Sequence, residues 1–255
     1  MNGFRSLPHL GWPALLTPMP AEIKPITFLV TALNEEENIE ATVKTVTTAM
    51  QEFICDYEFL LVNDGSTDST PQIMDRLALE NPRVRVLHNE RNLGLGGAYK
   101  RGVQHAHGEY VMWVSGDNAE IVDNLVNIIA HVGEADIIVP VLHATKARPW
   151  FRRFTSKAFT CIVNALFGLR VNYYNGTVIH RTELIRAVPI KTNSFAYQAE
   201  ALVKLLLKGR SYVEVPYTSA TYDGIFSYAM RPKNLFAVLK ALAVLFVDVH
   251  LSQKT

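Results

Sequence analysis

A repeated alternation of short apolar, β-rich runs with helical patterns constrains the fold of this chain more than any other sequence feature. Each run reads as a strand, and the runs occupy residues 26–30, 57–62, 84–87, 110–114 and 136–139. Strands that alternate with helices predict a mostly parallel sheet that helices cover on both faces. The expected fold class is therefore α/β and Rossmann-like.

Capping patterns predict where the first helices begin. Asn34 is a good N-cap residue, and Glu37 stands three places later in the capping-box position. Apolar residues then recur at helical spacing over 39–50. Pro71 favours the start of a second helix, and a third helix is expected to follow the glycine-rich loop 89–97.

Polar turns follow the first strands at one end of the predicted sheet. They comprise Thr31–Asn38, Asn63–Thr70, Asn89–Gly97 and Ser115–Glu120. Ligands of open α/β sheets bind at the carboxyl ends of the strands, where these turns fall. The helix N-termini that follow add free amides and a dipole that favour an anion. The turns therefore predict a ligand site at this edge.

Side chains in these turns suit a nucleoside diphosphate, although each has a plainer explanation. Asp64 can accept hydrogen bonds from a base or ribose, or belong to a solvated turn. The glycines of 89–97 would let the backbone approach a diphosphate, and Arg91 and Lys100 nearby would supply positive charge. The alternative is that these glycines serve only a tight turn. Asp117 can hold a divalent cation, or cap a turn.

The second half of the chain has a different pattern. An amphipathic helical pattern covers residues 150–169. Its beginning is basic, with Arg148, Arg152 and Arg153. Short strands near 177–180 and 212–215 flank a further helical pattern.

The last stretch, 235–251, is apolar over most of a helix. A narrow, less apolar stripe runs along it, formed by Lys233, Ala237, Lys240, Val244 and Asp248. The wide apolar face is compatible with core packing, a homodimer interface or an interfacial membrane anchor, the first two being favoured. The basic segment 148–157 is compatible with anionic headgroups.

Composition excludes several classes of protein. The net charge of +1 gives no support for nucleic-acid binding. Cys55 and Cys161 have no metal-ligand spacing and form no disulfide framework, which suits a reducing cytoplasm. Residues 1–24 are proline-rich without periodicity and are interpreted as an extension, not a signal peptide. The sequence contains no run of about 20 apolar residues, so it predicts no membrane-spanning helix.

Taken together and in this order, the motifs resemble family 2 glycosyltransferases of the GT-A fold. The branch they resemble most is that of polyprenol-phosphate (dolichol-phosphate) mannosyl- and glucosyltransferases. The residues that carry the resemblance are Thr31–Asn38, Val62–Thr70, Arg91–Gly102 and Gly108–Glu120. A weaker likeness continues through Arg152, Ser156, Asn175-Gly176, Gln198, Glu200 and 209–216.

The resemblance implies a division of the chain. Residues 25–232 would form the catalytic domain, with nucleotide-sugar binding over 25–140 and the acceptor side over 141–232. Residues 233–255 would add the apolar C-terminal helix.

The resemblance also implies roles for single residues. Thr31, Asn34 and Glu35 would line the nucleotide pocket, and Asp64 would bind the base. The whole donor site would comprise Thr31, Asn34, Glu35, Asp64, Arg91, Gly94, Lys100, Ser115 and Asp117. Asp117 matches the last position of the acidic Asp-X-Asp motif, which makes it the metal ligand.

On the acceptor side, Arg152 and Ser156 match a pair that grips phosphate in the polyprenol-phosphate branch, and Arg148 lies nearby. Glu200 lies near the region where other family members place a catalytic base; a helix-surface glutamate is the alternative. The residues with an expected catalytic role are Asp117, Glu200 and Arg152.

The chain departs from the family at the metal motif. Ser115 stands where the first aspartate is expected, and Ala119 where a further ligand often lies. One carboxylate and a hydroxyl make a poorer site for Mg²⁺ or Mn²⁺ than two carboxylates. Glu120 or Asp123 can compensate, so metal use is left open.

A second departure follows Val215-Pro216. The branch carries an arginine and then Gly-X-Ser-Lys there, whereas this chain has Tyr222–Tyr228. Either Arg231 and Lys233 replace the missing cations, or the acceptor is not a lipid phosphate.

The implied reaction is an inverting transfer in which the acceptor oxygen displaces the nucleoside diphosphate. A phosphate acceptor needs no general base, whereas a hydroxyl acceptor needs a carboxylate, for which Glu200 is the candidate. A cation at Asp117 and either Arg91 or Arg152 would stabilise the leaving diphosphate. The implied partners are a nucleotide sugar and a lipid-linked acceptor on the cytoplasmic membrane face.

Two other classes of protein share features with this chain. A sugar nucleotidyltransferase shares the fold class, but the glycine-rich activating loop is missing at the first strand. A non-catalytic nucleotide-sugar-binding protein would explain the degraded acidic motif.

Overall fold

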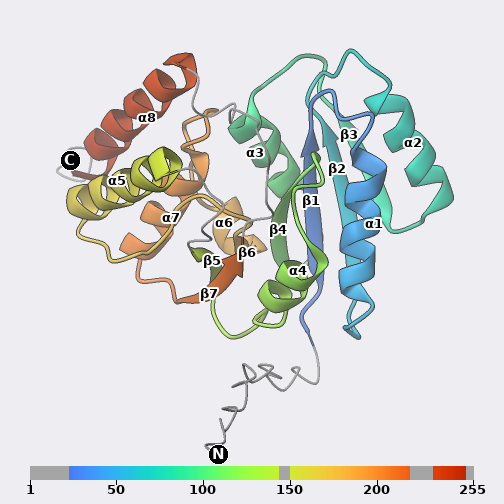
Figure 1. The fold of residues 1–255 in the computed structure, drawn as a ribbon, viewed down its shortest axis with the longest axis horizontal. Helices are drawn as coiled ribbons and strands as arrows, with labels where there is room; N and C mark the ends of the chain where they lie inside the picture. The colour runs from blue at the N-terminus through green and yellow to red at the C-terminus, as the bar shows by residue number, and fades with distance from the viewer. Residues whose placement is uncertain (1–22, 144–149, 219–231, 251–255) are drawn as a thin grey trace, which may run out of the picture.

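The computed structural model describes residues 23–143, 150–218 and 232–250. Helices surround a seven-stranded sheet (Figure 1). The strands are β1 (Ile26–Ala32), β2 (Tyr57–Asn63), β3 (Val84–His88), β4 (Tyr110–Ser115), β5 (Ile137–His143), β6 (Ile179–Arg181) and β7 (Tyr212–Thr218). The helices are α1 (Ile39–Met50), α2 (Thr70–Glu80), α3 (Leu95–His105), α4 (Val122–Ile129), α5 (Trp150–Phe167), α6 (Thr182–Arg186), α7 (Tyr197–Leu207) and α8 (Pro232–His250).

The strand order is β3-β2-β1-β4-β6-β5-β7. All pairings are parallel except the two made by β6, which is antiparallel to both β4 and β5. The prediction of a mostly parallel α/β sheet is therefore confirmed.

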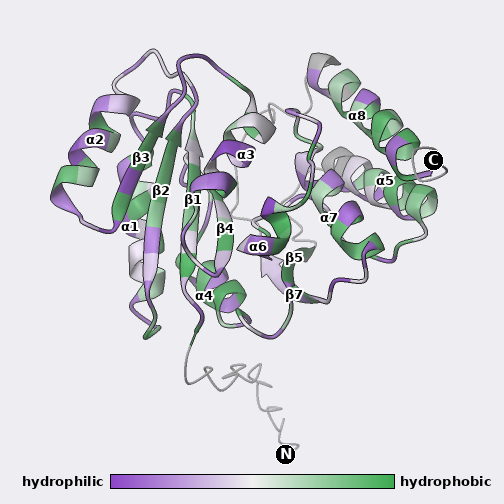
Figure 2. Ribbon diagram, turned by 180° about the vertical axis from the view of Figure 1, so that it is seen from behind, coloured by the Kyte–Doolittle hydropathy of each residue, from purple (hydrophilic) through white to green (hydrophobic). Residues whose placement is uncertain are grey.

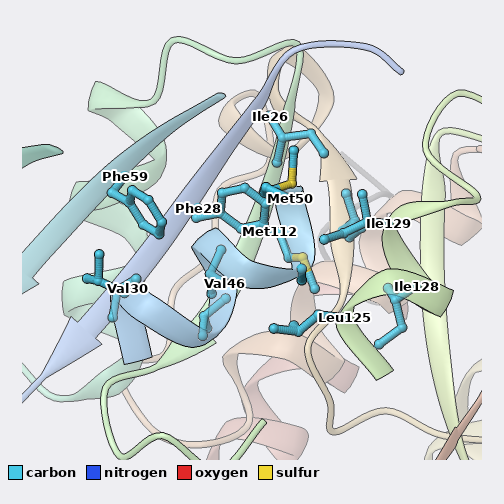
Figure 3. Packing of buried hydrophobic residues seen from close by; sticks show 14 of the residues in the cluster. Ile26, Phe28, Val30, Val46, Met50, Phe59, Met112, Leu125, Ile128 and Ile129 are labelled. Atoms are coloured by element: carbon cyan, nitrogen blue, oxygen red, sulfur yellow. The ribbon is translucent and has the colours of Figure 1, made fainter. Parts of the chain in front are cut away.

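Each face of the sheet has its own hydrophobic core. Strand residues alternate between the faces: Phe28 packs in the core under α1, α2 and α4, and Leu29 in the core with α3, α5, α7 and α8. Figure 3 shows the first core, where Phe28 and Phe59 lie with ring centroids 5.7 Å apart. Burying each such side chain contributes roughly 1.5–3 kcal/mol.

The expected start of the first helix is wrong. α1 begins at Ile39 with Asn38 at its N-cap, four residues after the expected cap. Asn34 instead adopts a left-handed conformation with a φ of 57°. Its side chain accepts a hydrogen bond from Thr67 N at 2.8 Å, so a contact with a distant loop replaces the helix cap. The third helix also begins earlier than expected, because Gly96 and Gly97 lie within α3.

The C-terminal helix packs against the second core on one side only. Leu242 and Leu245 of α8 are buried in that core, whereas Phe236 is 71% and Leu239 54% exposed. Figure 2 colours most of this helix as hydrophobic, although much of it lies at the outside of the molecule. Among the described helices, none is both long and apolar enough to cross a membrane.

Candidate functional site

The strand ends predicted to carry the site lie in register at one edge of the sheet. Thr31 of β1 pairs with Ser115 of β4, and Ala32 pairs with Asn63 of β2. Backbone hydrogen bonds continue beyond the strands, from Asp64 N to Ala32 O at 2.9 Å and from Gly116 N to Thr31 O at 3.0 Å. The turns after β1, β2 and β4 therefore meet, as the sequence predicted.

The turns after β1 and β2 are bonded to each other. Asn34 N donates to Ser66 Oγ at 2.9 Å, and Asn34 Oδ1 accepts from Thr67 N. Glu35 N donates to Thr70 Oγ1 at 2.8 Å. These bonds fix the backbone of Asn34 and Glu35, two of the expected donor-binding residues.

Asp64, which directly follows β2, organises the loop after β3. It is only 4% exposed, and its Oδ1 accepts from Asn89 Nδ2 at 2.7 Å and from Leu93 N at 2.9 Å. Gly65 has a φ of 76°, and a Cβ there would lie 2.8 Å from the Arg91 carbonyl carbon. Only glycine therefore lets the loop after β3 approach so closely.

Sequence reasoning did not identify Asn89 as part of this site. Asn89 is buried and follows β3 directly, as Asp64 follows β2. Its side-chain oxygen accepts from the Arg101 guanidinium, and its amide donates to Asp64. A polar residue directly after a strand was the signal that could have revealed it.

Besides its strand pairing with Ser115, Thr31 makes a side-chain hydrogen bond that the sequence did not suggest. The indole Nε1 of Trp113, on β4, donates to Thr31 Oγ1 at 2.9 Å. Thr31 is buried, and Ser115 beside it is half-buried. The bond orients the Thr31 hydroxyl at the end of β1.

Asp117 lies in a region of negative charge. Burial raises the pKa of Glu35. A hydrogen bond from Asn38 opposes this rise, and the negative charges of Asp117 and Asp68 add to it. Burial likewise raises the pKa of Glu120, again helped by the charge of Asp117. Asp117 thus stands close to two further carboxyl groups.

Glu120 is the more buried of the two residues expected to compensate for the degraded acidic motif. Its Oε1 accepts from the Thr177 hydroxyl, and that bond opposes the rise in its pKa. Asp123 is exposed at the start of α4. Within the described ranges, no three His, Cys, Asp or Glu side chains are arranged to hold a metal ion.

The glycine-rich turn packs on a segment from the second half of the chain. Gly94, with a φ of 78°, is the N-cap of α3, and a Cβ there would lie 2.9 Å from Asn193 O. Gly96 N donates to the same carbonyl at 3.1 Å. Arg91 is exposed and pairs with no carboxylate in the part of the chain that the structure describes.

Lys100 reaches the same distant segment. Its Nζ donates to Ile190 O at 3.2 Å, and burial lowers its pKa while the charge of Glu200 opposes that shift. The structure therefore places the Lys100 ammonium on the backbone of 189–194, a contact that the sequence did not suggest.

Glu200 is not the helix-surface residue that was the alternative to a base. It is 5% exposed on α7, and its Oε1 accepts from Lys204 Nζ at 2.7 Å and Lys191 N at 2.9 Å. Its Oε2 accepts from Thr192 N at 3.0 Å. Both carboxylate oxygens therefore hold protein donors.

The expected phosphate-gripping residues are only partly described. Arg152 and Ser156 lie one turn apart on α5, and Ser156 is half-buried. Arg148 and the segment Tyr222–Tyr228 lie outside the described residues, as does Arg231.

Comparison with known proteins bears on the family and the fold of the chain. The family described as "Glycosyl transferase family 2" matches residues 27–196. Mannosyl-3-phosphoglycerate synthase from Rubrobacter xylanophilus is similar in structure, with a TM-score of 0.71 at 14% identity over 91% of this chain and 77% of that one.

Glucosyl-3-phosphoglycerate synthase from Mycobacterium tuberculosis, solved with UDP, is also similar, with a TM-score of 0.65 at 15% identity over 88% of this chain and 79% of that one. The same enzyme has been solved with Mn²⁺, UDP and its glucosyl product, and that structure matches with a TM-score of 0.65 at 15% identity over 87% of this chain and 80% of that one. At these identities, the likeness establishes the fold.

Proposed function

This chain belongs to glycosyl transferase family 2, and we propose that it moves a sugar from a nucleotide-sugar donor to a phosphate on a lipid acceptor at a membrane surface. It is a glycosyltransferase with a GT-A-type fold. The observation that carries the donor part of the proposal is the convergence of Asn34, Asp64, Arg91 and Asp117 on turns at one edge of the sheet. Open α/β sheets bind nucleotides at this edge.

Each group in this set has a distinct part in holding the donor. The buried Asp64 accepts hydrogen bonds from the base, and Thr31, Asn34 and Glu35 form the wall of the nucleotide pocket. The exposed Arg91 approaches the diphosphate, because a guanidinium binds phosphate oxygens in a bidentate manner.

A diphosphate and the carboxylate of Asp117 are both negatively charged, so a positive charge is needed between the two groups. Glu35 and Glu120 both feel the charge of Asp117, so this region would repel an anionic donor. A divalent cation removes the conflict, since Mg²⁺ binds through one or two carboxylates together with substrate phosphates. Asp117 is the proposed ligand, with Ser115 beside it, which agrees with the described residues offering no complete protein cage. Mn²⁺ and UDP occur together in the similar glucosyl-3-phosphoglycerate synthase.

The proposed reaction is a single displacement with inversion. An oxygen of the acceptor phosphate forms a bond to the anomeric carbon as the bond from that carbon to the diphosphate oxygen breaks. The electron pair leaves with the nucleoside diphosphate, whose charge Arg91 and Arg152 stabilise. A phosphate acceptor is already anionic, so no side chain has to remove a proton.

The outer surface of α5 and α8 supports a lipid acceptor. The two helices lie side by side at one end of the molecule, where the rings of Phe167 and Phe246 are 6.4 Å apart (Figures 1 and 2). Their exposed large apolar side chains are Phe154, Ile162, Phe236, Leu239, Val244, Phe246 and Val247.

The charges on this outer surface have one sign. Arg153, Lys157 and Lys240 are exposed, and α5 contains no acidic residue. Asp248, the acidic residue of α8, is bonded to Lys191 and Lys204 in the protein. Apolar side chains interspersed with cations are typical of a surface that lies on anionic lipid, and we place the enzyme there, on the cytoplasmic face.

A small phosphorylated acceptor is the second candidate. It is favoured by the structural likeness to enzymes whose acceptor is phosphoglycerate, and by the absence of the expected Gly-X-Ser-Lys after Pro216 in the sequence. The donor site would be the same for either acceptor. Phosphoglycerate also has a hydroxyl, and transfer to that oxygen would release a proton that a base must accept, whereas transfer to a lipid phosphate would not.

A transfer assay separates the two acceptors. The protein is incubated with labelled UDP-glucose or GDP-mannose and Mn²⁺, and with either a short polyprenyl phosphate in detergent or 3-phosphoglycerate. We expect label on the polyprenyl phosphate only. Label on 3-phosphoglycerate alone would exclude the lipid acceptor, and failure to bind any nucleotide sugar would contradict the donor proposal.

Membrane docking is tested with a double variant, Phe236→Ser with Leu239→Ser. Because both side chains are more than half exposed, the substitutions remove apolar surface without opening the core. Sedimentation with vesicles that contain phosphatidylglycerol should weaken at least about 10-fold. Leu79→Ser is the matched control, since Leu79 is 89% exposed on α2, at the other end of the molecule (Figure 1). Equal loss in the double variant and the control, or no loss in either, would reject this surface.

A further inference from the structure

A buried group of charges joins α7, α8 and the segment 189–194. Lys204 Nζ, on α7, bonds to Glu200 Oε1 at 2.7 Å, to Asp248 Oδ2 of α8 at 2.8 Å and to Pro189 O at 2.8 Å. Asp248 also pairs with Lys191. Glu200 and Lys204 are each less than a tenth exposed, so removing one partner leaves a buried charge uncompensated.

Glu200 connects this group of charges to the backbone of segment 189–194. Its two carboxylate oxygens accept from the amides of Lys191 and Thr192 at 2.9 and 3.0 Å. Charge-assisted hydrogen bonds of this kind are about twice as strong as neutral ones. The position of the segment therefore depends on the carboxylate of Glu200.

The same segment supports the glycine-rich turn that faces the donor. Asn193 O accepts from Gly96 N at 3.1 Å, and a Cβ at Gly96 would lie 2.9 Å from Thr192 O. Just before α3, the N–H of Leu93 in this turn donates to Asp64 Oδ1 at 2.9 Å. A continuous series of contacts thus runs from α8 to the buried aspartate of the proposed nucleotide pocket.

We infer that Glu200 is a positioning residue, which holds segment 189–194 against the glycine-rich turn and so fixes the loop that receives the donor. The inference rests on the proposed donor site and assigns Glu200 no proton transfer. An acceptor hydroxyl that used Glu200 as its base would have to reach a side chain that is 5% exposed and already accepts three hydrogen bonds from the protein.

The test compares Glu200→Gln and Asp248→Asn in the full chain. Glutamine retains the size of Glu200 but loses the charge that pairs with Lys204, and Asp248→Asn acts on the same segment from α8. Glu80→Gln is the control, because Glu80 is exposed on α2 and pairs only with Arg76 among the described residues. Binding of UDP and of GDP with Mn²⁺ is measured by calorimetry, and kcat is measured against pH at saturating donor.

We expect both variants to raise the dissociation constant of the nucleotide roughly 10-fold, as for the loss of a charge-assisted hydrogen bond. The turnover number and the shape of its pH profile should stay close to those of the wild type. If Glu200→Gln does not fold, the test uses Asp248→Asn alone. Asp248 contacts neither the amides of the segment nor the glycine-rich turn, and it acts on the segment through its pairs with Lys191 and Lys204.

Two results would overturn the inference. Unchanged nucleotide binding together with a loss in kcat of about 100- to 10,000-fold, and loss of one limb of the pH profile, would identify a general base. If folded variants kept both nucleotide binding and kcat unchanged, the buried charges around Lys204 would only stabilise the fold. A wild-type chain that binds neither nucleotide would contradict the proposed donor site itself, which is a separate outcome.

Discussion

Replacing Asp117 with asparagine is expected to lower kcat/KM about 100- to 1,000-fold, because the charge that holds the cation against the donor diphosphate is lost. Asparagine keeps the side-chain oxygen that accepts from Ala119 N at 3.2 Å, so the turn after β4 should be retained. The same substitution should make nucleotide-sugar binding independent of Mn²⁺. Calorimetry with and without the cation measures this second effect directly.

Asp123→Asn provides the matched comparison for Asp117→Asn. Asp123 belongs to the same stretch of sequence but is exposed at the start of α4. Its substitution should leave the cation dependence as in the wild type. If Asp117→Asn also retained it, the cation would be held by other residues. Wild-type binding that did not depend on the cation would instead leave Arg91 and Arg152 to stabilise the leaving diphosphate.

Periodicity predicted the strands and helices of the first half closely. The strand after residue 25 and the helix over 39–50 were recognisable because a buried parallel strand is continuously apolar, whereas a helix against the sheet repeats every three to four residues. The end of each strand also placed Asp64 and Asp117 at the sheet edge. Such inferences need only local sequence and the rule that ligands bind there.

The contacts between loops could not be read in the same way. Asn34 looks like a helix cap because caps are recognised from neighbouring residues, yet its partner is Thr67, 33 positions away. Glu200 and Lys204 have the spacing of an ordinary surface pair on a helix. Their burial depends on the packing of distant parts of the chain. The sequence of α7 does not indicate that Asp248 of α8 pairs with Lys204. The three-residue antiparallel β6 is too short for its direction to be predicted.

Asp64→Asn is expected to weaken donor binding roughly 10- to 100-fold, the effect of losing a hydrogen bond to a charged acceptor. The amide oxygen of asparagine can still accept from Asn89 Nδ2 and Leu93 N, the two bonds that hold the loop after β3. The variant therefore removes the charge and one acceptor from the pocket and leaves the loop in place.

Asp64→Ala separates recognition of the base from organisation of the loop. It leaves the Leu93 amide and the Asn89 side chain without their acceptor, so the free energy of unfolding should also fall by about 1–3 kcal/mol. Urea denaturation measures that loss, and calorimetry with UDP and GDP measures binding. If the asparagine variant bound both nucleotides as the wild type does while the alanine variant did not, Asp64 would act only through the loop. Base recognition would then have to come from another residue at this edge of the sheet.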